Sequence, residues 1–183
     1  MQHLKKQAIK NIRDFKDICD RLGIDFCLMD GTLLGAYRDK DIIKGDEDDI
    51  DLGIMDKDYR IMEIIDEMEK IGFDTSKRLW VKGRIEGLGA IRGGTHIDVI
   101  RINTDENGSY NLANNIGGGH VAYTYPKIEK FIDIEFLGDT YKAPENIEEF
   151  LEHRYTDWKT PLGRDKYDYL SFKDVPGLKI YKC

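Results

Sequence analysis

An acidic run that enters an apolar strand limits most strongly what this chain can fold into. Residues 46–54 read DEDDIDLGI. Because side chains alternate along a strand, Asp49 and Asp51 are expected on one face, with Ile50 and Leu52 facing a core on the other. Two carboxylates on one face repel each other unless a cation lies between them, and hard oxygen ligands select Mg²⁺ or Mn²⁺ rather than zinc. The run therefore predicts a metal-dependent phosphate site.

The remaining acidic residues of the run have two interpretations. Acidic runs usually belong to solvated loops, and Asp46, Glu47 and Asp48 fit that description. Asp49 and Asp51 differ because they lie inside the start of a hydrophobic strand. Whether Asp46 or Asp48 joins them at the metal stays open.

A glycine turn precedes the run. An apolar strand at residues 24–29 leads into Gly31-Thr32 and a short helix. Gly31 fits an ordinary turn, yet a Gly-Thr pair that opens a helix also aims backbone N–H groups at a phosphate. Asp30 is expected to cap this helix, with a role in orienting substrate as the alternative.

A third carboxylate lies in a later strand, residues 95–101, which reads THIDVIR. Ile97 and Val99 share one face, and His96 and Asp98 share the other. An aspartate inside a β-branched apolar run is costly to bury without a partner, and a metal held with Asp49 and Asp51 supplies one. A structural hydrogen-bond network is the alternative for Asp98, and His96 is a minor candidate for a base.

The two motifs carry a family resemblance. GTLLGAYR at residues 31–38, followed by DIDLGIM at residues 49–55, resembles the signature of the LicD/fukutin family. The similarity extends from Ile24 to Pro161 and includes the strand at residues 132–136 and the helix at residues 147–155. The family in turn is similar to the nucleotidyltransferase superfamily.

The resemblance implies a fold and a set of site residues. The expected fold is α+β, a nucleotidyltransferase-like mixed sheet with helices packed on it, in a compact single domain over residues 1–183: a helix at 4–22, a core at 24–161 and a tail at 162–183. Asp49, Asp51 and Asp98 would hold one or two Mg²⁺ or Mn²⁺ ions and serve as catalytic residues. The expected phosphate or substrate contacts come from Gly31, Thr32, Arg38 and Lys40. A salt bridge is the alternative for Arg38, and neutralising the acidic run is the alternative for Lys40.

The resemblance also implies an activity. The expected reaction is metal-dependent transfer of a phospho-alcohol, such as phosphocholine or ribitol phosphate, from a CDP-linked donor to a carbohydrate hydroxyl. The alternatives are nucleotidyl transfer from an NTP to a small hydroxylated acceptor, and a catalytically silent nucleotide-binding module.

The composition of the chain limits the classes of partner that it is expected to bind. The 183 residues carry a net charge of -7, which argues against a nucleic-acid groove. No apolar run is long enough to span a bilayer. Cys19, Cys27 and Cys183 show no metal or disulfide spacing, so reduced thiols in a cytoplasmic setting are expected. The oligomeric state stays open.

Three further expectations concern other segments. A helix from Lys57 to about Ile71 is predicted, capped by Asp56, with an inward face made of Tyr59, Met62, Ile65 and Met68. The glycine-rich stretch from Thr104 to Tyr123 is predicted to be a mobile loop. Tyr155 and Trp158 are expected either to stack on a nucleobase or to clamp the chain to the core.

Overall fold

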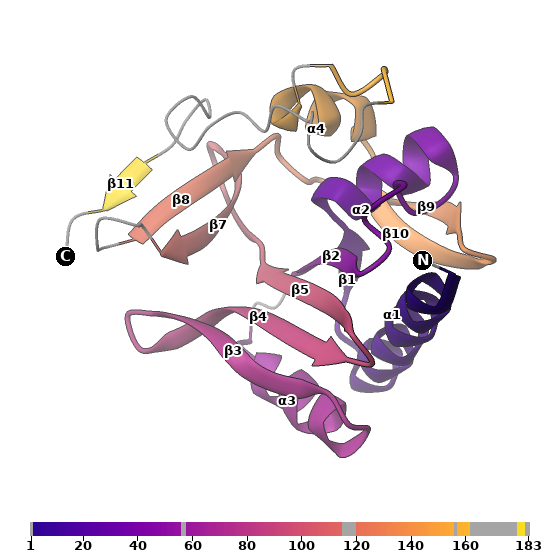
Figure 1. The fold of residues 1–183 in the computed structure, drawn as a ribbon. Helices are drawn as coiled ribbons and strands as arrows, with labels where there is room; N and C mark the ends of the chain where they lie inside the picture. The colour runs from indigo at the N-terminus through magenta and orange to yellow at the C-terminus, as the bar shows by residue number, and fades with distance from the viewer. Residues whose placement is uncertain (1, 56–57, 115–119, 156, 162–178, 182–183) are drawn as a thin grey trace.

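A five-stranded mixed sheet forms the centre of the fold (Figure 1), with the strand order β1-β2-β5-β4-β3. The computed structural model describes residues 2–55, 58–114, 120–155, 157–161 and 179–181. β2 and β5 run parallel, and the other neighbouring strands are antiparallel. The bounds are β1 (Phe26–Leu28), β2 (Asp49–Ile54), β3 (Asp74–Val81), β4 (Arg84–Arg92) and β5 (Thr95–Arg101).

Two helices, α1 (Gln2–Leu22) and α3 (Ile61–Lys70), pack against each other and against this sheet (Figure 1). Four apolar residues of α1 at helical spacing are buried: Ala8, Ile12, Phe15 and Ile18. On the sheet, Ile50, Leu52, Ile97 and Val99 are buried with them. The alternation of β2 and β5 therefore places their aspartates on the opposite face. The expected α+β fold with helices on a mixed sheet is confirmed.

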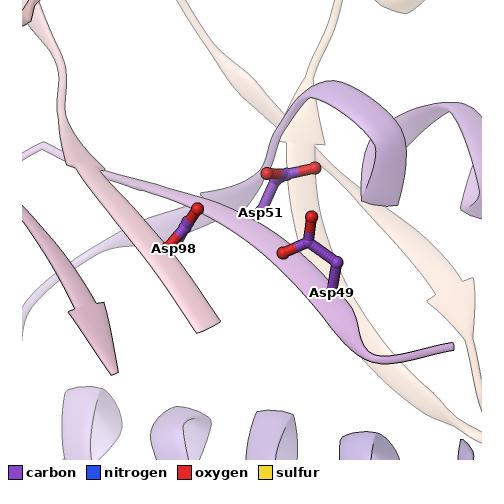
Figure 2. A group of neighbouring side chains, drawn as sticks. All are labelled: Asp49, Asp51 and Asp98. Atoms are coloured by element: carbon purple, nitrogen blue, oxygen red, sulfur yellow. The ribbon is translucent and has the colours of Figure 1, made fainter. Parts of the chain in front are cut away.

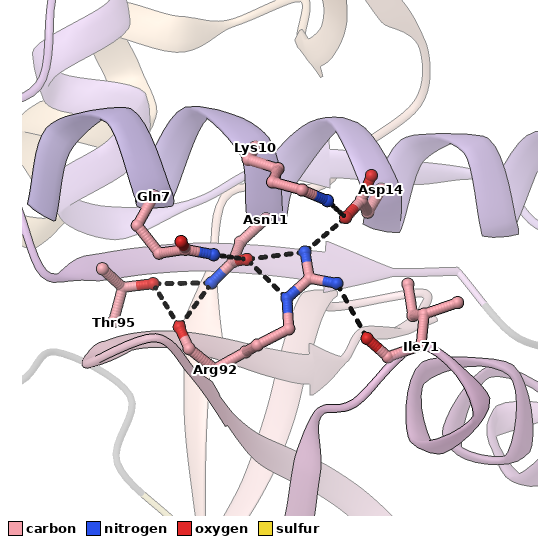
Figure 3. Close-up of polar contacts among 7 residues, drawn as sticks. All are labelled: Gln7, Lys10, Asn11, Asp14, Ile71, Arg92 and Thr95. Carbon is pink, nitrogen blue, oxygen red and sulfur yellow. Dashed lines mark hydrogen bonds and ion pairs between the residues drawn. The ribbon is translucent and has the colours of Figure 1, made fainter. Parts of the chain in front are cut away.

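A buried asparagine joins α1 to the start of β5 (Figure 3). The Asn11 amide donates to Thr95 Oγ1 at 2.6 Å and to the Arg92 carbonyl at 3.0 Å, and its Oδ1 accepts two hydrogen bonds from the Arg92 guanidinium. The same guanidinium pairs with Asp14 and lies over the Phe73 ring. Because Asn11 is fully buried, these bonds hold β5 in register against the helix.

The segment predicted as a mobile loop after Thr104 is largely strand, so that prediction was wrong. β6 (Asn103–Asp105), β7 (Gly108–Asn114) and β8 (His120–Tyr125) form antiparallel pairs, and β11 (Lys179–Tyr181) pairs with β8. Polar side chains are buried here through hydrogen bonds. The Tyr125 hydroxyl donates to Asn111 Oδ1 at 2.8 Å, and Ser109 Oγ accepts from the Ile128 N–H at 3.0 Å. A polar composition therefore concealed the strands; residues 115–119 of the predicted loop lie outside the described residues.

The prediction for α3 was wrong at its start and in part of its inward face. The helix begins at Ile61, and its buried residues are Ile61, Ile64, Ile65 and Met68. Tyr59 and Met62 are 39% and 42% exposed. The residue at position 59 precedes the helix: Tyr59 lies against the guanidiniums of Arg84 and Arg101. The predicted cap Asp56 and first residue Lys57 lie outside the described residues.

The remaining elements flank the strand ends that carry the aspartates. Their bounds are α2 (Asp30–Leu34), the π-helical turn η1 (Gly35–Asp39), β9 (Phe131–Phe136), β10 (Asp139–Pro144) and α4 (Ile147–Arg154). β9 and β10 form a hairpin, and α4 contacts α2, β8 and β10. None of the helices in the described ranges has the length and apolarity needed to cross a bilayer. Cys19 and Cys27 are buried free thiols, and burial raises the pKa of Cys27 to about 12.

Candidate metal centre

Three carboxylates converge on one face of the central sheet (Figure 2). β2 and β5 pair in a register that sets Asp49 beside His96 and Asp51 beside Asp98. One oxygen from each of Asp49, Asp51 and Asp98 lies within 4.8 Å of the other two. The structure therefore brings together the three aspartates that the sequence singled out.

The backbone around Gly31 and Thr32 holds Asp51. The Gly31 N–H donates to Asp51 Oδ2 at 3.0 Å, and Thr32 Oγ1 accepts from the Asp51 N–H at 2.8 Å. A Cβ at position 31 would lie 3.1 Å from Asp46 Oδ2 and 3.2 Å from Asp51 Oδ2. A larger residue at position 31 would therefore require these two carboxylates to shift by a few tenths of an ångström. The predicted phosphate contacts of Gly31 and Thr32 stay predictions; in the structure both residues position Asp51.

Electrostatic repulsion is concentrated at Asp51. Desolvation of its half-buried carboxylate, together with the negative charges of Asp30, Asp49, Asp98 and Asp46, raises the pKa of Asp51 well above its ordinary value. Asp98 is exposed, and partial desolvation raises its pKa too, although His96 and Lys77 act in the opposite direction. Within the described residues, neither Asp51 nor Asp98 forms an ion pair with a basic side chain.

This arrangement fits a divalent cation. The three ligand atoms are hard carboxylate oxygens close enough to share one ion, and a bound cation would offset the repulsion that raises the pKa of Asp51. The donor set contains no sulfur and no ring nitrogen, which favours Mg²⁺ or Mn²⁺ over zinc. Asp46 borders the cluster near Gly31 but is not among the three converging residues.

Arg38 and Lys40 have other contacts in the structure. The Arg38 guanidinium pairs with Asp39 at 2.7 Å and donates to the Trp158 carbonyl at 3.0 Å. Lys40 is exposed, and its ammonium lies 5.3 Å from the centre of the Tyr37 ring. These contacts match the salt-bridge alternative for Arg38, and the phosphate contacts of both residues stay predictions.

The expected capping role of Asp30 was wrong. Met29 is the residue before α2 and no side chain caps the helix, while Asp30 adopts a left-handed backbone with φ 39. Its carboxylate forms an ion pair with the Arg154 Nε at 2.8 Å, bridging α2 and α4. Burial alone would lower the pKa of Arg154, but the Asp30 carboxylate together with the hydroxyls of Tyr125 and Tyr155 outweighs it and raises the pKa. The guanidinium also faces the Tyr123 ring at 5.7 Å.

Arg154 is a site residue that the sequence did not reveal. Its carboxylate partner Asp30 is one of the charges that act on Asp51, so Arg154 stands one ion pair away from the cluster. In the sequence it is an ordinary basic residue in the last turn of a helix. The weak signal available was its place directly before the aromatic position Tyr155.

Tyr155 and Trp158 are buried, with exposed fractions of 3% and 7%. The Trp158 ring packs against Tyr37 with ring centres 5.7 Å apart. Of the two interpretations, burial favours the clamp to the core over stacking on a nucleobase.

Comparison with known proteins identifies the family. The model described as "LicD/FKTN/FKRP, nucleotidyltransferase domain" matches residues 23–146. The chain belongs to this family, as the two sequence motifs indicated. No curated protein matches the sequence significantly.

Solved structures share the fold at low sequence identity. A solution structure of the antibiotic-resistance factor ANT(2'')-Ia has a TM-score of 0.50 and 14% identity, over 76% of this chain and 66% of that one. A crystal structure of ANT(2")-Ia in complex with adenylyl-2"-tobramycin has a TM-score of 0.51 and 14% identity, over 79% of this chain and 72% of that one. The fold is that of the nucleotidyltransferases, and family and fold together support a function of the phosphotransferase or nucleotidyltransferase type.

Proposed function

We propose that the protein is a metal-dependent phosphotransferase that moves a phospho-alcohol from a CDP-linked donor to a carbohydrate hydroxyl. The observation that carries the proposal is the convergence of Asp49, Asp51 and Asp98 on one face of a nucleotidyltransferase sheet. Membership of the LicD family supports the CDP-linked donor. Mg²⁺ or Mn²⁺ is the cofactor that the carboxylate donor set favours.

The reaction is a displacement at phosphorus. The acceptor oxygen forms a bond to the phosphorus that carries the small alcohol, the bond from that phosphorus to the bridging oxygen breaks, and CMP leaves with the electron pair. When bound, the cation supplies charge stabilisation to the phosphoryl oxygens. Positioning and charge account for most of the rate in such transfers.

The residues of the chain have separate roles in this reaction. Asp49, Asp51 and Asp98 would hold the cation. Asp98 is the exposed one of the three, so we assign its carboxylate the additional role of accepting the proton of the acceptor hydroxyl. Thr32 and Gly31 keep Asp51 in place through the bonds at 2.8 Å and 3.0 Å. Arg154 holds Asp30 at the edge of the cluster.

Nucleotidyl transfer from an NTP is the second candidate. It is favoured by the structural neighbour ANT(2")-Ia, which was solved with adenylyl-2"-tobramycin. In that reaction the acceptor attacks the phosphorus next to the nucleoside, and pyrophosphate leaves. The two candidates use the same aspartates and differ in the phosphorus attacked and in the leaving group.

Ligand-induced stabilisation followed by product analysis tests the proposal. CDP-choline, CDP-ribitol, CDP-glycerol, CTP and ATP would be screened by thermal shift with Mg²⁺, because a ligand stabilises the folded state by mass action. We expect a CDP-alcohol to give the largest shift and turnover to release CMP. Pyrophosphate release from CTP or ATP would instead establish nucleotidyl transfer.

The matched variants are Asp49→Asn and Asp66→Asn. Asp66 is an exposed aspartate on α3 and serves as the control for the change of charge. Asp49→Asn is expected to lose activity by about 10²-fold or more and to lose Mg²⁺-dependent donor binding, while Asp66→Asn keeps both. If the wild-type protein shows no turnover and Asp49→Asn binds the donor as the wild type does, the result would point to the catalytically silent binding module.

A further inference from the structure

A row of four residues crosses the sheet from the metal centre to its far edge. Strand pairing sets Asp51 opposite Asp98, Asp98 opposite Gly89, and Gly89 opposite Lys77. Directly paired residues point to the same face of a sheet, so the triad, the glycine and the lysine share one surface. Two strands, β4 and β3, thus extend the catalytic face beyond Asp98.

This surface is hollowed beside Asp98. A groove of about 430 Å³ is lined by residues of β3, β4 and β5, among them Lys77, Gly87, Gly89, His96 and Asp98. A Cβ at position 89 would lie 3.2 Å from Asp98 Oδ1 and 3.2 Å from the Lys77 Cβ. Any larger side chain would close the passage between the carboxylate and the lysine. The hollow therefore borders Asp98, one of the three carboxylates of the triad.

Lys77 provides a positive charge at the far end of the row. It is exposed, and within the described residues it forms no ion pair at contact distance, unlike its neighbour Arg78, which pairs with Glu69 at 2.8 Å. Its stem lies over Gly89, and its charge acts on Asp98.

The two sides of the triad differ in how open they are. On the flank of Asp51, α2 and the Asp30–Arg154 ion pair close against the carboxylate. On the flank of Asp98 the groove is open. In-line displacement requires the attacking and leaving oxygens on opposite sides of the phosphorus. The side of Asp98, where the groove is open, is therefore the side from which the acceptor hydroxyl would arrive.

We propose that the groove over Gly87 and Gly89 is the acceptor subsite and that Lys77 binds an anionic group, a phosphate or a carboxylate, on the acceptor sugar. The inference rests on the proposed function, because it takes the transfer at the triad as given. It adds a substrate class, an anionic carbohydrate, and a specificity residue outside the metal centre. A lysine that merely offsets the charge of Asp98 is the structural alternative.

Binding of matched sugars tests the subsite. Glucose, glucuronate and a glucose phosphate would be titrated by calorimetry or NMR in the presence of Mg²⁺. We expect one or both anionic sugars to bind at least about tenfold more tightly than glucose, the value of one charge-assisted hydrogen bond. The stronger of the two identifies phosphate or carboxylate as the preferred group. Equal binding of all three, or binding of none, overturns the proposal.

Three lysine variants test whether Lys77 causes the preference for an anionic sugar. Lys77→Met keeps the stem and removes the charge, so it should lose the preference for the anionic sugar, and Lys77→Arg should retain most of it. Lys82→Met, at the exposed turn between β3 and β4, is the control for net charge and should behave as wild type. Unchanged preference in Lys77→Met overturns the assignment.

Donor binding separates this inference from the proposed function. Lys77→Met should keep the Mg²⁺-dependent thermal shift with the CDP-alcohol, whereas Asp49→Asn should lose it. If Lys77→Met weakens donor binding as much as sugar binding, Lys77 contacts the donor and the acceptor subsite is overturned. If no CDP-alcohol is used as a donor but the anionic sugar still depends on Lys77, the proposed donor fails and the subsite stands.

Discussion

Thr32 and Asp51 are joined by a hydrogen bond of 2.8 Å in which the Thr32 hydroxyl accepts from the Asp51 backbone N–H. The threonine lies in α2 and the aspartate in β2, so this bond couples the glycine turn to the cluster of three aspartates. Thr32 is buried, with 5% of its surface exposed. A buried backbone donor without a partner is costly, and no water has easy access to replace the hydroxyl.

Thr32→Val should therefore destabilise the protein by about 1 to 3 kcal/mol and reduce turnover through a displaced Asp51. Thr32→Ser keeps the acceptor and should retain most activity. Chemical denaturation and a metal titration of both variants would measure the two effects. Equal metal affinity in the valine and serine variants would contradict the positioning role.

Asp51→Asn should stabilise the protein when no divalent cation is present. The amide keeps the oxygen that accepts from the Gly31 N–H and removes the charge that desolvation and neighbouring carboxylates penalise. A domain of this size gains roughly 2 to 4 °C in Tm for each kcal/mol of stabilisation, so a measurable rise in Tm is expected. Activity and Mg²⁺-induced stabilisation should be lost.

The pH dependence of this effect has a definite sign. Because the pKa of Asp51 is raised on folding, the folded state holds a proton that the unfolded state has released, and stability falls as pH rises from about 4 through the raised pKa. The Tm difference between Asp51→Asn and wild type in EDTA should widen between pH 4 and neutrality. A constant difference across that range would contradict the origin in charge repulsion.

Arg154→Met should destabilise the protein by about 1.5 to 3 kcal/mol, because it leaves the Asp30 carboxylate without its guanidinium partner beside an acidic cluster. The double variant Asp30→Asn with Arg154→Met removes both charges and should recover part of the loss. Denaturant unfolding of the wild type, Asp30→Asn, Arg154→Met and the double variant forms a complete double-mutant cycle. Strict additivity would show that the pair contributes nothing to stability.

Asn11→Ala should lower the free energy of unfolding by about 1 to 3 kcal/mol, because it removes the hydrogen bonds to Arg92 on β4 and Thr95 on β5. Gln7→Ala removes only a donor to the same Asn11 oxygen and should cost much less. Because Asn11 anchors the start of β5, hydrogen exchange at Thr95 should rise in Asn11→Ala. Unchanged exchange there would show that the strand does not depend on this anchor.

The three converging aspartates were predictable because each belongs to a pattern that is visible within one short segment. Asp49, Asp51 and Asp98 each interrupt an apolar strand at a spacing that sends them to the face opposite the core, and the observed burial of Ile50 and Ile97 agrees. The strands of β6 to β8 escaped prediction because the buried positions of β7 include polar residues. There, Ser109 and Asn111 satisfy hydrogen bonds that no hydrophobic pattern reveals.

The amino-acid sequence by itself determined the family, the mixed sheet with its amphipathic helices, and the identity of the three carboxylates, since each depends on motif or on periodicity along one segment. Tertiary structure alone decided which groups meet. Register placed Asp51 beside Asp98 and set Gly89 and Lys77 in the same row, and packing of α4 on α2 paired Arg154 with Asp30. Those contacts join residues distant in the chain, and strand pairing and side-chain packing in three dimensions, rather than local propensity, select them.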